Sequence, residues 1–163
     1  MVLMIFSKSF GYAVRGVLYI GLQGNKRHVQ AKEIASVLAV PKHFMGKILK
    51  RLVKEEVLSS VKGPSGGFMV NAHTMNTPLF RLFAITEGLS TLETCTLKFS
   101  KCDSINPCPL HFEMEKLRDD LKQILSDNTI ASLMTGDKAQ LIKSITNIPG
   151  DELVHTGIIQ TIY

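Results

Sequence analysis

The sequence predicts a mainly α-helical fold with one small β-hairpin, and three features of the chain support that prediction. Apolar residues recur at helical spacing through residues 7–55 and again from about residue 108 to 124. Between these segments, VLSSVKGPSGGFMV (residues 57–70) alternates like two short strands around a glycine-rich turn. With 163 residues, 45% of them apolar, the chain can form one ordinary domain core with an appended arm.

Three helices are expected before the hairpin, at residues 7–23, 31–38 and 41–55. Pro41 suits the first turn of the third helix, because its missing N–H would have no intrahelical partner there. The apolar face of that helix is expected to be buried and holds Phe44, Met45, Ile48, Leu49, Leu52 and Val53. The opposite face carries four residues at helical spacing, His43, Lys47, Lys50 and Lys54.

Two short helices joined by a tight turn, the second with a basic face, are typical of a helix-turn-helix. The alternative is a helical hairpin whose lysines are merely solvated. The β-hairpin favours DNA binding, because a hairpin directly after a helix-turn-helix is a wing, and its tip offers Lys62 and several backbone N–H groups to phosphates. A nucleotide-binding phosphate loop is not expected, because the turn leads into a strand and lacks the Lys-Ser/Thr pair. The predicted fold is therefore a winged helix-turn-helix.

The charge of the chain is uneven. Residues 1–75 carry eleven Lys and Arg against three Asp and Glu, a balance of +8, and residues 76–163 carry eight against eleven, a balance of −3. The basic half predicts a polyanion-binding module and the acidic half a second module with another task. A basic face without a partner is the alternative.

A further helix is expected to open at Thr77 and Pro78, as N-cap and first-turn residue, and to end at Gly88. A long helix is expected to begin at Cys108 and Pro109. Its apolar stripe is narrow and has charged flanks, which fits either a dimer seam or packing onto its own domain. The stripe consists of Leu110, Met114, Leu117, Leu121 and Ile124.

No pattern is assigned after about Met134. These features predict a winged helix-turn-helix domain at residues 1–75, a second module with a polar loop and a long helix at 76–135, and a C-terminal arm of unassigned role at 136–163.

All three cysteines, Cys95, Cys102 and Cys108, fall within fourteen residues, and His111 follows shortly after. The chain shows no secretory signal and no apolar run of about 18 residues, so we expect a cytoplasmic protein without a membrane span. In that compartment thiols stay reduced, and clustered cysteines bind metal more often than they pair.

An iron–sulfur cluster, a zinc site, a thiol switch and the absence of any role all remain open for this window. Zinc is disfavoured by the lack of short C-x₂₋₄-C pairs, and inert core cysteines are disfavoured because the loop is polar. An enzyme built on the Cys108–His111 pair is not expected, because no oxyanion or substrate site accompanies it.

The run PKHFMGKILKRLVKEEVLSSVKGPSGGF resembles the winged helix-turn-helix regulators that include the iron–sulfur regulator IscR, the nitric-oxide sensor NsrR and the cysteine-metabolism regulator CymR. The resemblance extends from FSKSFGYAVRGVLYI to about residue 135. Its most specific element is LSSVKGPSGGF, where Lys62 stands at a position usually held by arginine. It implies a homodimer, joined through the long helix, that sets two recognition helices (residues 41–54) into successive major grooves of a near-palindromic double-stranded operator.

The DNA-binding residues expected from the basic faces together with this resemblance are Lys8, Tyr12, Lys32, Lys42, His43, Gly46, Lys47, Lys50, Lys62, Gly63, Ser65 and Gly66.

The resemblance also implies an iron–sulfur cluster held by Cys95, Cys102 and Cys108. Their Cys-x₆-Cys-x₅-Cys spacing is one residue longer than in most cluster-bearing members. Some members complete the cluster with a carboxylate at the start of the partner subunit's first helix, but the matching residue here is Gly11.

His111 matches the histidine that other members use as the fourth ligand. Three thiolates and one imidazole favour a [2Fe–2S] centre, with [4Fe–4S] as the alternative. We therefore expect a transcription regulator whose operator affinity is set by a cluster that senses redox state or nitric oxide. The alternative is a cluster-free dimer controlled by a partner protein or by cysteine oxidation.

Overall fold

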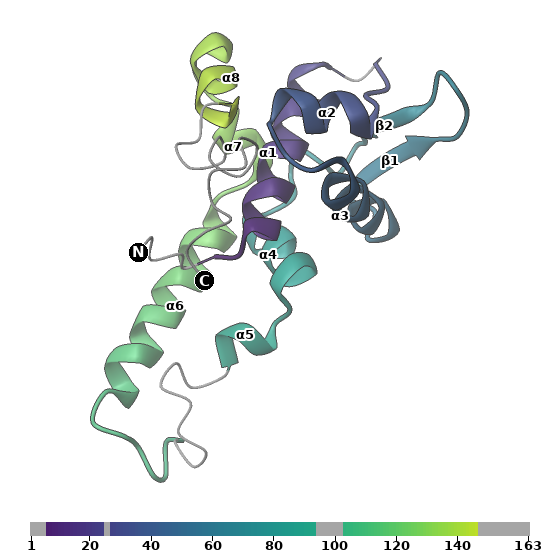
Figure 1. The fold of residues 1–163 in the computed structure, drawn as a ribbon. Helices are drawn as coiled ribbons and strands as arrows, with labels where there is room; N and C mark the ends of the chain where they lie inside the picture. The colour runs from purple at the N-terminus through teal and green to yellow at the C-terminus, as the bar shows by residue number, and fades with distance from the viewer. Residues whose placement is uncertain (1–5, 25–26, 94–102, 147–163) are drawn as a thin grey trace, which may run out of the picture.

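The computed structural model describes residues 6–24, 27–93 and 103–146 (Figure 1). Its elements, in chain order, are α1 (Lys8–Leu22), α2 (Ala31–Val37), α3 (Lys42–Lys54), β1 (Leu58–Val61), β2 (Gly67–Val70), α4 (Leu79–Glu87), α5 (Ser90–Glu93), α6 (His111–Asp127), α7 (Ile130–Leu133) and α8 (Lys138–Thr146). Helices dominate the described residues, with one small antiparallel sheet, so the predicted fold class is confirmed.

Helix α1 lies at the centre of the molecule. It packs against α2, α3 and β2 on one side and against α4, α7 and α8 on the other (Figure 1). Ala13, Val17 and Ile20 are fully buried along it, and the ring of Phe10 meets the ring of Phe83 from α4 at a centroid distance of 5.8 Å. A single hydrophobic core therefore holds the helix-turn-helix against the rest of the protein.

The turn between α2 and α3 is fixed by backbone hydrogen bonds. The N–H of Leu38 donates to Ile34 O at 3.0 Å, and that of Val40 donates to Ala35 O at 2.9 Å. Between them Ala39 has a φ of +52°, which few residues with a Cβ adopt. Pro41 stands at the N-cap of α3, one residue before its predicted place in the first turn.

The two strands of the hairpin pair in antiparallel register, with Leu58 opposite Val70 and Ser60 opposite Phe68. Val29, just before α2, adds a third short segment, because its N–H and C=O pair with Phe68 at 2.8 and 2.9 Å. The hairpin is therefore joined to the helix-turn-helix at its base.

The start of α4 is bonded to the end of α6. The N–H of Leu79 donates to Asn128 O at 2.8 Å, and that of Ile130 donates to Thr77 O at 3.1 Å. This bridge keeps the chain extended at Pro78, which is the N-cap of α4. The predicted N-cap role of Thr77 was wrong, since its hydroxyl donates backward to His73 O at 2.9 Å.

Helix α6 begins at His111, three residues later than expected, and extends away from the core as a long arm (Figure 1). Helix α6 is followed by the short helix α7, and the chain after Met134, where no pattern was assigned, forms α8. Across the described residues, every helix is too short or too polar to cross a membrane.

Candidate DNA-binding surface and sensor loop

Helix α3 is fixed by one face and presents cations on the other. Its buried side chains are Met45, Ile48, Leu49 and Leu52. The exposed side chains include Lys42, His43, Lys47, Lys50, Arg51 and Lys54. A rigid helix with a row of cations is suited to a major groove lined by phosphates.

Gly46 lies on this cationic face, one residue before Lys47. A Cβ placed there would meet no atom within 4 Å, so packing does not require a glycine. The missing side chain leaves bare backbone in the middle of the helix face that is predicted to approach DNA.

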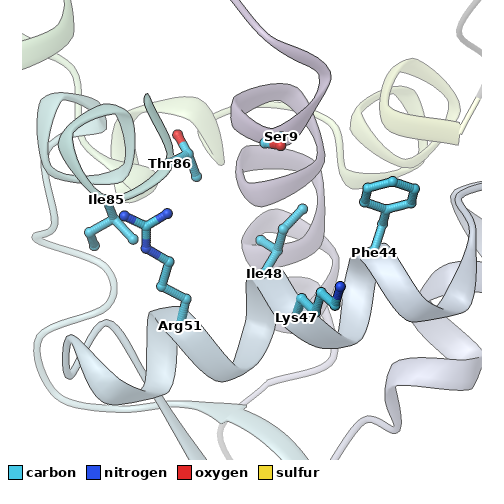
Figure 2. Close-up of a pocket in the computed structure, with 7 residues that line it drawn as sticks. All are labelled: Ser9, Phe44, Lys47, Ile48, Arg51, Ile85 and Thr86. Atoms are coloured by element: carbon cyan, nitrogen blue, oxygen red, sulfur yellow. The ribbon is translucent and has the colours of Figure 1, made fainter. Parts of the chain in front are cut away.

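The prediction that Phe44 is buried was wrong. It lies in the first turn of α3, where the core does not reach it, and it is 48% exposed. Its ring packs against the ring of His43 at a centroid distance of 4.4 Å. Figure 2 shows Phe44 at one end of a groove between α1, α3 and α4, which is lined by Ser9, Phe44, Lys47, Ile48, Arg51, Ile85 and Thr86.

The wing tip carries the second group of predicted contacts. Lys62, Gly63 and Ser65 are exposed, and Gly63 has a φ of +116°, which favours glycine. Gln30, just before α2, donates from Nε2 to Pro64 O at 2.8 Å. The wing tip is therefore held in place relative to the helix-turn-helix.

Gly66 and Gly67 are explained by close packing. A Cβ on Gly66 would lie 2.1 Å from Val61 O, and one on Gly67 would lie 2.6 Å from Val29 O. Gly66 is buried. Of the predicted wing contacts, Gly66 is thus the one that packs inside the turn, while Lys62, Gly63 and Ser65 face solvent.

The remaining predicted DNA contacts lie on other helices. Lys8 is exposed at the start of α1, and Lys32 is exposed in the first turn of α2. Tyr12 is half-buried against the core. These three residues are spread over two helices, whereas Lys42, His43, Lys47 and Lys50 share α3.

The described residues of the predicted cluster site are Cys108, just before α6, and His111, the first residue of α6. Cys108 has a free, half-buried thiol. The N–H of His111 donates to Cys108 O at 3.0 Å, so the two residues lie on one turn at the start of α6. The Nε2 atom of His111 is shielded from solvent. A thiolate and an imidazole are both suitable ligands for an iron–sulfur cluster.

Cys95 and Cys102, the other two predicted ligands, lie outside the described residues. Among residues 6–24, 27–93 and 103–146, no group of three Cys, His, Asp or Glu side chains could hold a metal ion. Those ranges include only two of the four predicted ligands.

The predicted dimer stripe of α6 is largely solvent-exposed in the single chain. Leu117 and Ile124 are each 58% exposed, and Leu110 is also exposed. Met114 and Leu121 are half-buried. Leu125, which lies off the stripe, is the buried residue of α6. Most of the apolar stripe therefore has no cover from its own domain.

Comparison with known proteins identifies the family. The model of the Rrf2 family, described as iron-dependent transcriptional regulators, matches residues 6–136. The chain belongs to the Rrf2 family. It is therefore related to DNA-binding transcription regulators, and the expectation that it is no enzyme is confirmed.

Individual relatives agree with the Rrf2 assignment. An HTH-type transcriptional regulator of Aquifex aeolicus is 31% identical over 140 residues, which cover 85% of this chain and 96% of the relative. The regulator NsrR of Geobacillus kaustophilus is 24% identical, over 80% of this chain and 88% of the relative.

Solved structures of Rrf2 proteins show the same fold. CymR, the global cysteine regulator of B. subtilis, matches with a TM-score of 0.68 at 15% identity, over 83% of this chain and all of that one. IscR of T. potens matches with a TM-score of 0.66 at 19% identity, over 85% of this chain and 92% of that one. The resemblance proposed from the sequence is confirmed at the level of family and fold.

Sequence analysis missed three residues of the candidate surface. Arg51 follows Lys47 by four residues, so its charge and spacing could have placed it beside the cationic face. Phe44 matched the apolar stripe by spacing, and nothing local showed that the core stops short of it. Gln30 gave no local signal, because its partner Pro64 is 34 residues away.

Proposed function

We propose that this Rrf2 protein is a cytoplasmic homodimer that binds a near-palindromic operator and changes its affinity with the state of an iron–sulfur cluster. Residues 1–75 would bind DNA, and residues 76–135 would sense and dimerise. The observation that carries the proposal is the cationic face of α3, whose opposite face is buried, together with a wing tip that Gln30 bonds to the same helix-turn-helix.

DNA binding is supported by how the two surfaces are held. The exposed lysines of α3 and Lys62 of the wing offer charge to phosphates from two elements. The wing is bonded to the helix-turn-helix through Val29 and Gln30. A groove-reading helix and a backbone-reading wing in fixed relation would set the register of the protein on the duplex.

Dimerisation is supported by the exposed stripe of α6. Leu110, Leu117 and Ile124 would bury their side chains against a second copy of the same helix, as in a two-helix seam. Two DNA-binding surfaces held by one seam would bind two half-sites about one helical turn apart, or a multiple of it.

Cluster binding is supported by the donor chemistry at the start of α6. Cys95, Cys102, Cys108 and His111 would hold the cluster, which would supply a centre sensitive to oxidation and iron supply. The described pair fits, because Cys108 is a free thiol and His111 follows it on the same turn.

The bond network of α6 offers a path from the sensor to the DNA-binding surface. Ligation at Cys108 and His111 would fix the first turn of α6, and its last residues are bonded to the start of α4. Helix α4 in turn packs on α1 and α3. Movement of α6 would therefore alter the distance between the two α3 helices in a dimer.

The test combines iron analysis with operator selection. The full-length protein is purified anaerobically, iron and sulfide are measured, and binding sites are selected from random duplexes with loaded and iron-stripped protein. We expect a coloured protein that selects a two-half-site sequence in one state and binds it weakly in the other. A colourless, iron-free protein that selects the same sites would refute the cluster part.

A second candidate keeps the DNA-binding dimer but replaces the cluster with thiol chemistry. It is favoured by one observation, the free and partly accessible thiol of Cys108. In this case operator affinity would change with peroxide treatment and return with a thiol reductant in iron-free protein.

A further inference from the structure

Arg15 is a buried cation at the centre of the fold. It lies in the middle of α1 and is 5% exposed. Its Nε donates to Ile145 O at 2.6 Å, and its Nη2 donates to Leu38 O at 2.6 Å. One guanidinium thus bonds the turn of the helix-turn-helix to the last turn of α8, 130 residues along the chain from Arg15.

Both acceptors lie at the ends of helices. Leu38 is the C-cap of α2, and Ile145 lies in the last turn of α8. Carbonyls at these positions lack intrahelical partners, and the negative end of the helix dipole favours a cation there. Arg15 therefore satisfies two helix ends at once, and those bonds stabilise its charge in the core.

Helix α8 is otherwise attached by few side chains. Ile145 is buried and Leu141 is half-buried against the core, while most other residues of the helix are exposed. The match to the Rrf2 family model ends at residue 136, before α8 begins. The docking of α8 is thus a contact of this chain with its own helix-turn-helix, made beyond the matched region.

We propose that α8 and Arg15 together hold the turn between α2 and α3 in its conformation, and that they thereby fix the orientation of the recognition helix α3. Arg15 is a positioning residue, and α8 is the element through which DNA affinity can be adjusted. When α8 leaves α1, water reaches the guanidinium and competes with Leu38 O for it. The turn at Ala39, whose φ is +52°, then loses a bond that holds it. The effect of Arg15 on DNA affinity rests on the proposed function, whereas its effect on the turn does not.

The test introduces a positive charge, because the direct effect of such a charge on DNA binding is opposite to the effect that the proposal predicts. In the full-length chain, Ile145→Lys places a second cation beside Arg15 and undocks α8. An added positive charge by itself strengthens binding to DNA. The matched control is Ile142→Lys, which adds the same charge to an exposed position of the same helix.

Two readouts are compared in both variants. The first is hydrogen exchange of the Leu38 and Val40 amides, which needs no DNA and reports the turn even if no operator is found. The second is the ratio of specific to non-specific duplex affinity. For Ile145→Lys we expect faster exchange at the turn and roughly ten-fold weaker specific binding, with non-specific binding kept. Ile142→Lys should match the parent.

Arg15→Met and Arg15→Lys complete the test. Arg15→Met should reproduce the faster exchange at the turn, and combining it with Ile145→Lys should add little, because both remove the same link. Arg15→Lys keeps the charge and should recover part of the protection. If Ile145→Lys does not fold, Ile145→Ala gives the same comparison with a smaller effect. Undocked α8, seen by fast exchange within α8, together with parent-like exchange at the turn would overturn the proposal.

Discussion

Helix α3 and helix α6 are both amphipathic, but they use their apolar faces in opposite ways. Helix α3 buries four apolar residues and turns its cations to solvent. Helix α6 buries only Leu125 among its described residues and leaves Leu117 and Ile124 exposed. The candidate DNA-binding surface is therefore formed by residues of one chain, whereas α6 presents an apolar stripe that a second surface would cover.

The largest effect is expected from breaking the seam. Leu117→Glu places a charge in the middle of the stripe, at a side chain that is 58% exposed in the single chain and adds little to its stability. The variant should be a folded monomer that binds the two-half-site operator at least about 100-fold more weakly, because one half-site no longer assists the other. Sedimentation and operator titration measure both effects.

The control for this change is Gln123→Glu, which puts the same charge on an exposed position of α6 off the stripe. It should remain dimeric. Intact dimers of Leu117→Glu would remove α6 from the interface.

The next effect concerns the ligands at the start of α6. Cys108→Ser should lose most of the iron, since a thiolate is replaced by a weak ligand. His111→Ala should keep three thiolates and assemble a shorter-lived cluster with altered visible absorption. Iron content and spectra of the two variants, purified anaerobically, distinguish these outcomes.

Gly11 allows a sharper version of the same test. A side chain at Gly11 would meet no atom within 4 Å, so an aspartate fits there without a clash. The resemblance implies that in some members of the family a carboxylate at this position completes the cluster of the partner subunit. Gly11→Asp added to His111→Ala should therefore lengthen the lifetime of the cluster, while Gly11→Asn should not. Equal lifetimes for the two double variants would show that a carboxylate at position 11 does not reach the cluster.

The cationic surface predicts a smaller and more uniform effect. Lys62→Ala and Arg51→Ala should each weaken binding to all duplexes and lower the slope of log affinity against log salt by about 1. Lys116→Ala, on α6, should leave that slope unchanged. If the slope changed with Lys116→Ala and not with the other two variants, the phosphate contacts would lie on α6, and the prediction would be wrong.

The smallest expected effects are on the free energy of unfolding, and they differ in sign between two glycines of the candidate DNA-binding surface. Gly66→Ala should lower the free energy of unfolding by about 1–3 kcal/mol, because its Cβ would lie 2.1 Å from Val61 O. Gly46→Ala should raise it by about 0.5–1 kcal/mol, since alanine favours the helix and space is open. Chemical denaturation of both variants tests whether Gly66→Ala is less stable, and Gly46→Ala more stable, than the parent.

Sequence patterns predicted the elements whose structure depends on nearby residues. The helices from Lys8 to Lys54 and the hairpin around Gly63 follow from local periodicity and turn chemistry. Thr77 was wrongly predicted to be the N-cap of α4. The start of that helix is set by a bridge between Pro78 and Thr129, which are distant in sequence.

The same limit applies to the candidate site. The exposed lysines of α3 could be predicted from helical spacing alone. Phe44 could not, because its exposure depends on how α1 and α4, which line the same groove, are placed around α3 (Figure 2). The bonds of Arg15 to Leu38 and Ile145 join three separate helices, and no local pattern marks them.

The central claim is that one chain carries a complete DNA-binding surface whose use in a dimer is governed by the loop before α6. The most direct measurement is the operator affinity of a single anaerobic preparation before and after iron is removed, with the dimer fraction recorded in each state. We expect at least about a ten-fold change in specific affinity, with non-specific binding nearly constant, because the charge of α3 and the wing is untouched. A preparation that contains a cluster but binds its operator equally well with and without iron would contradict the account.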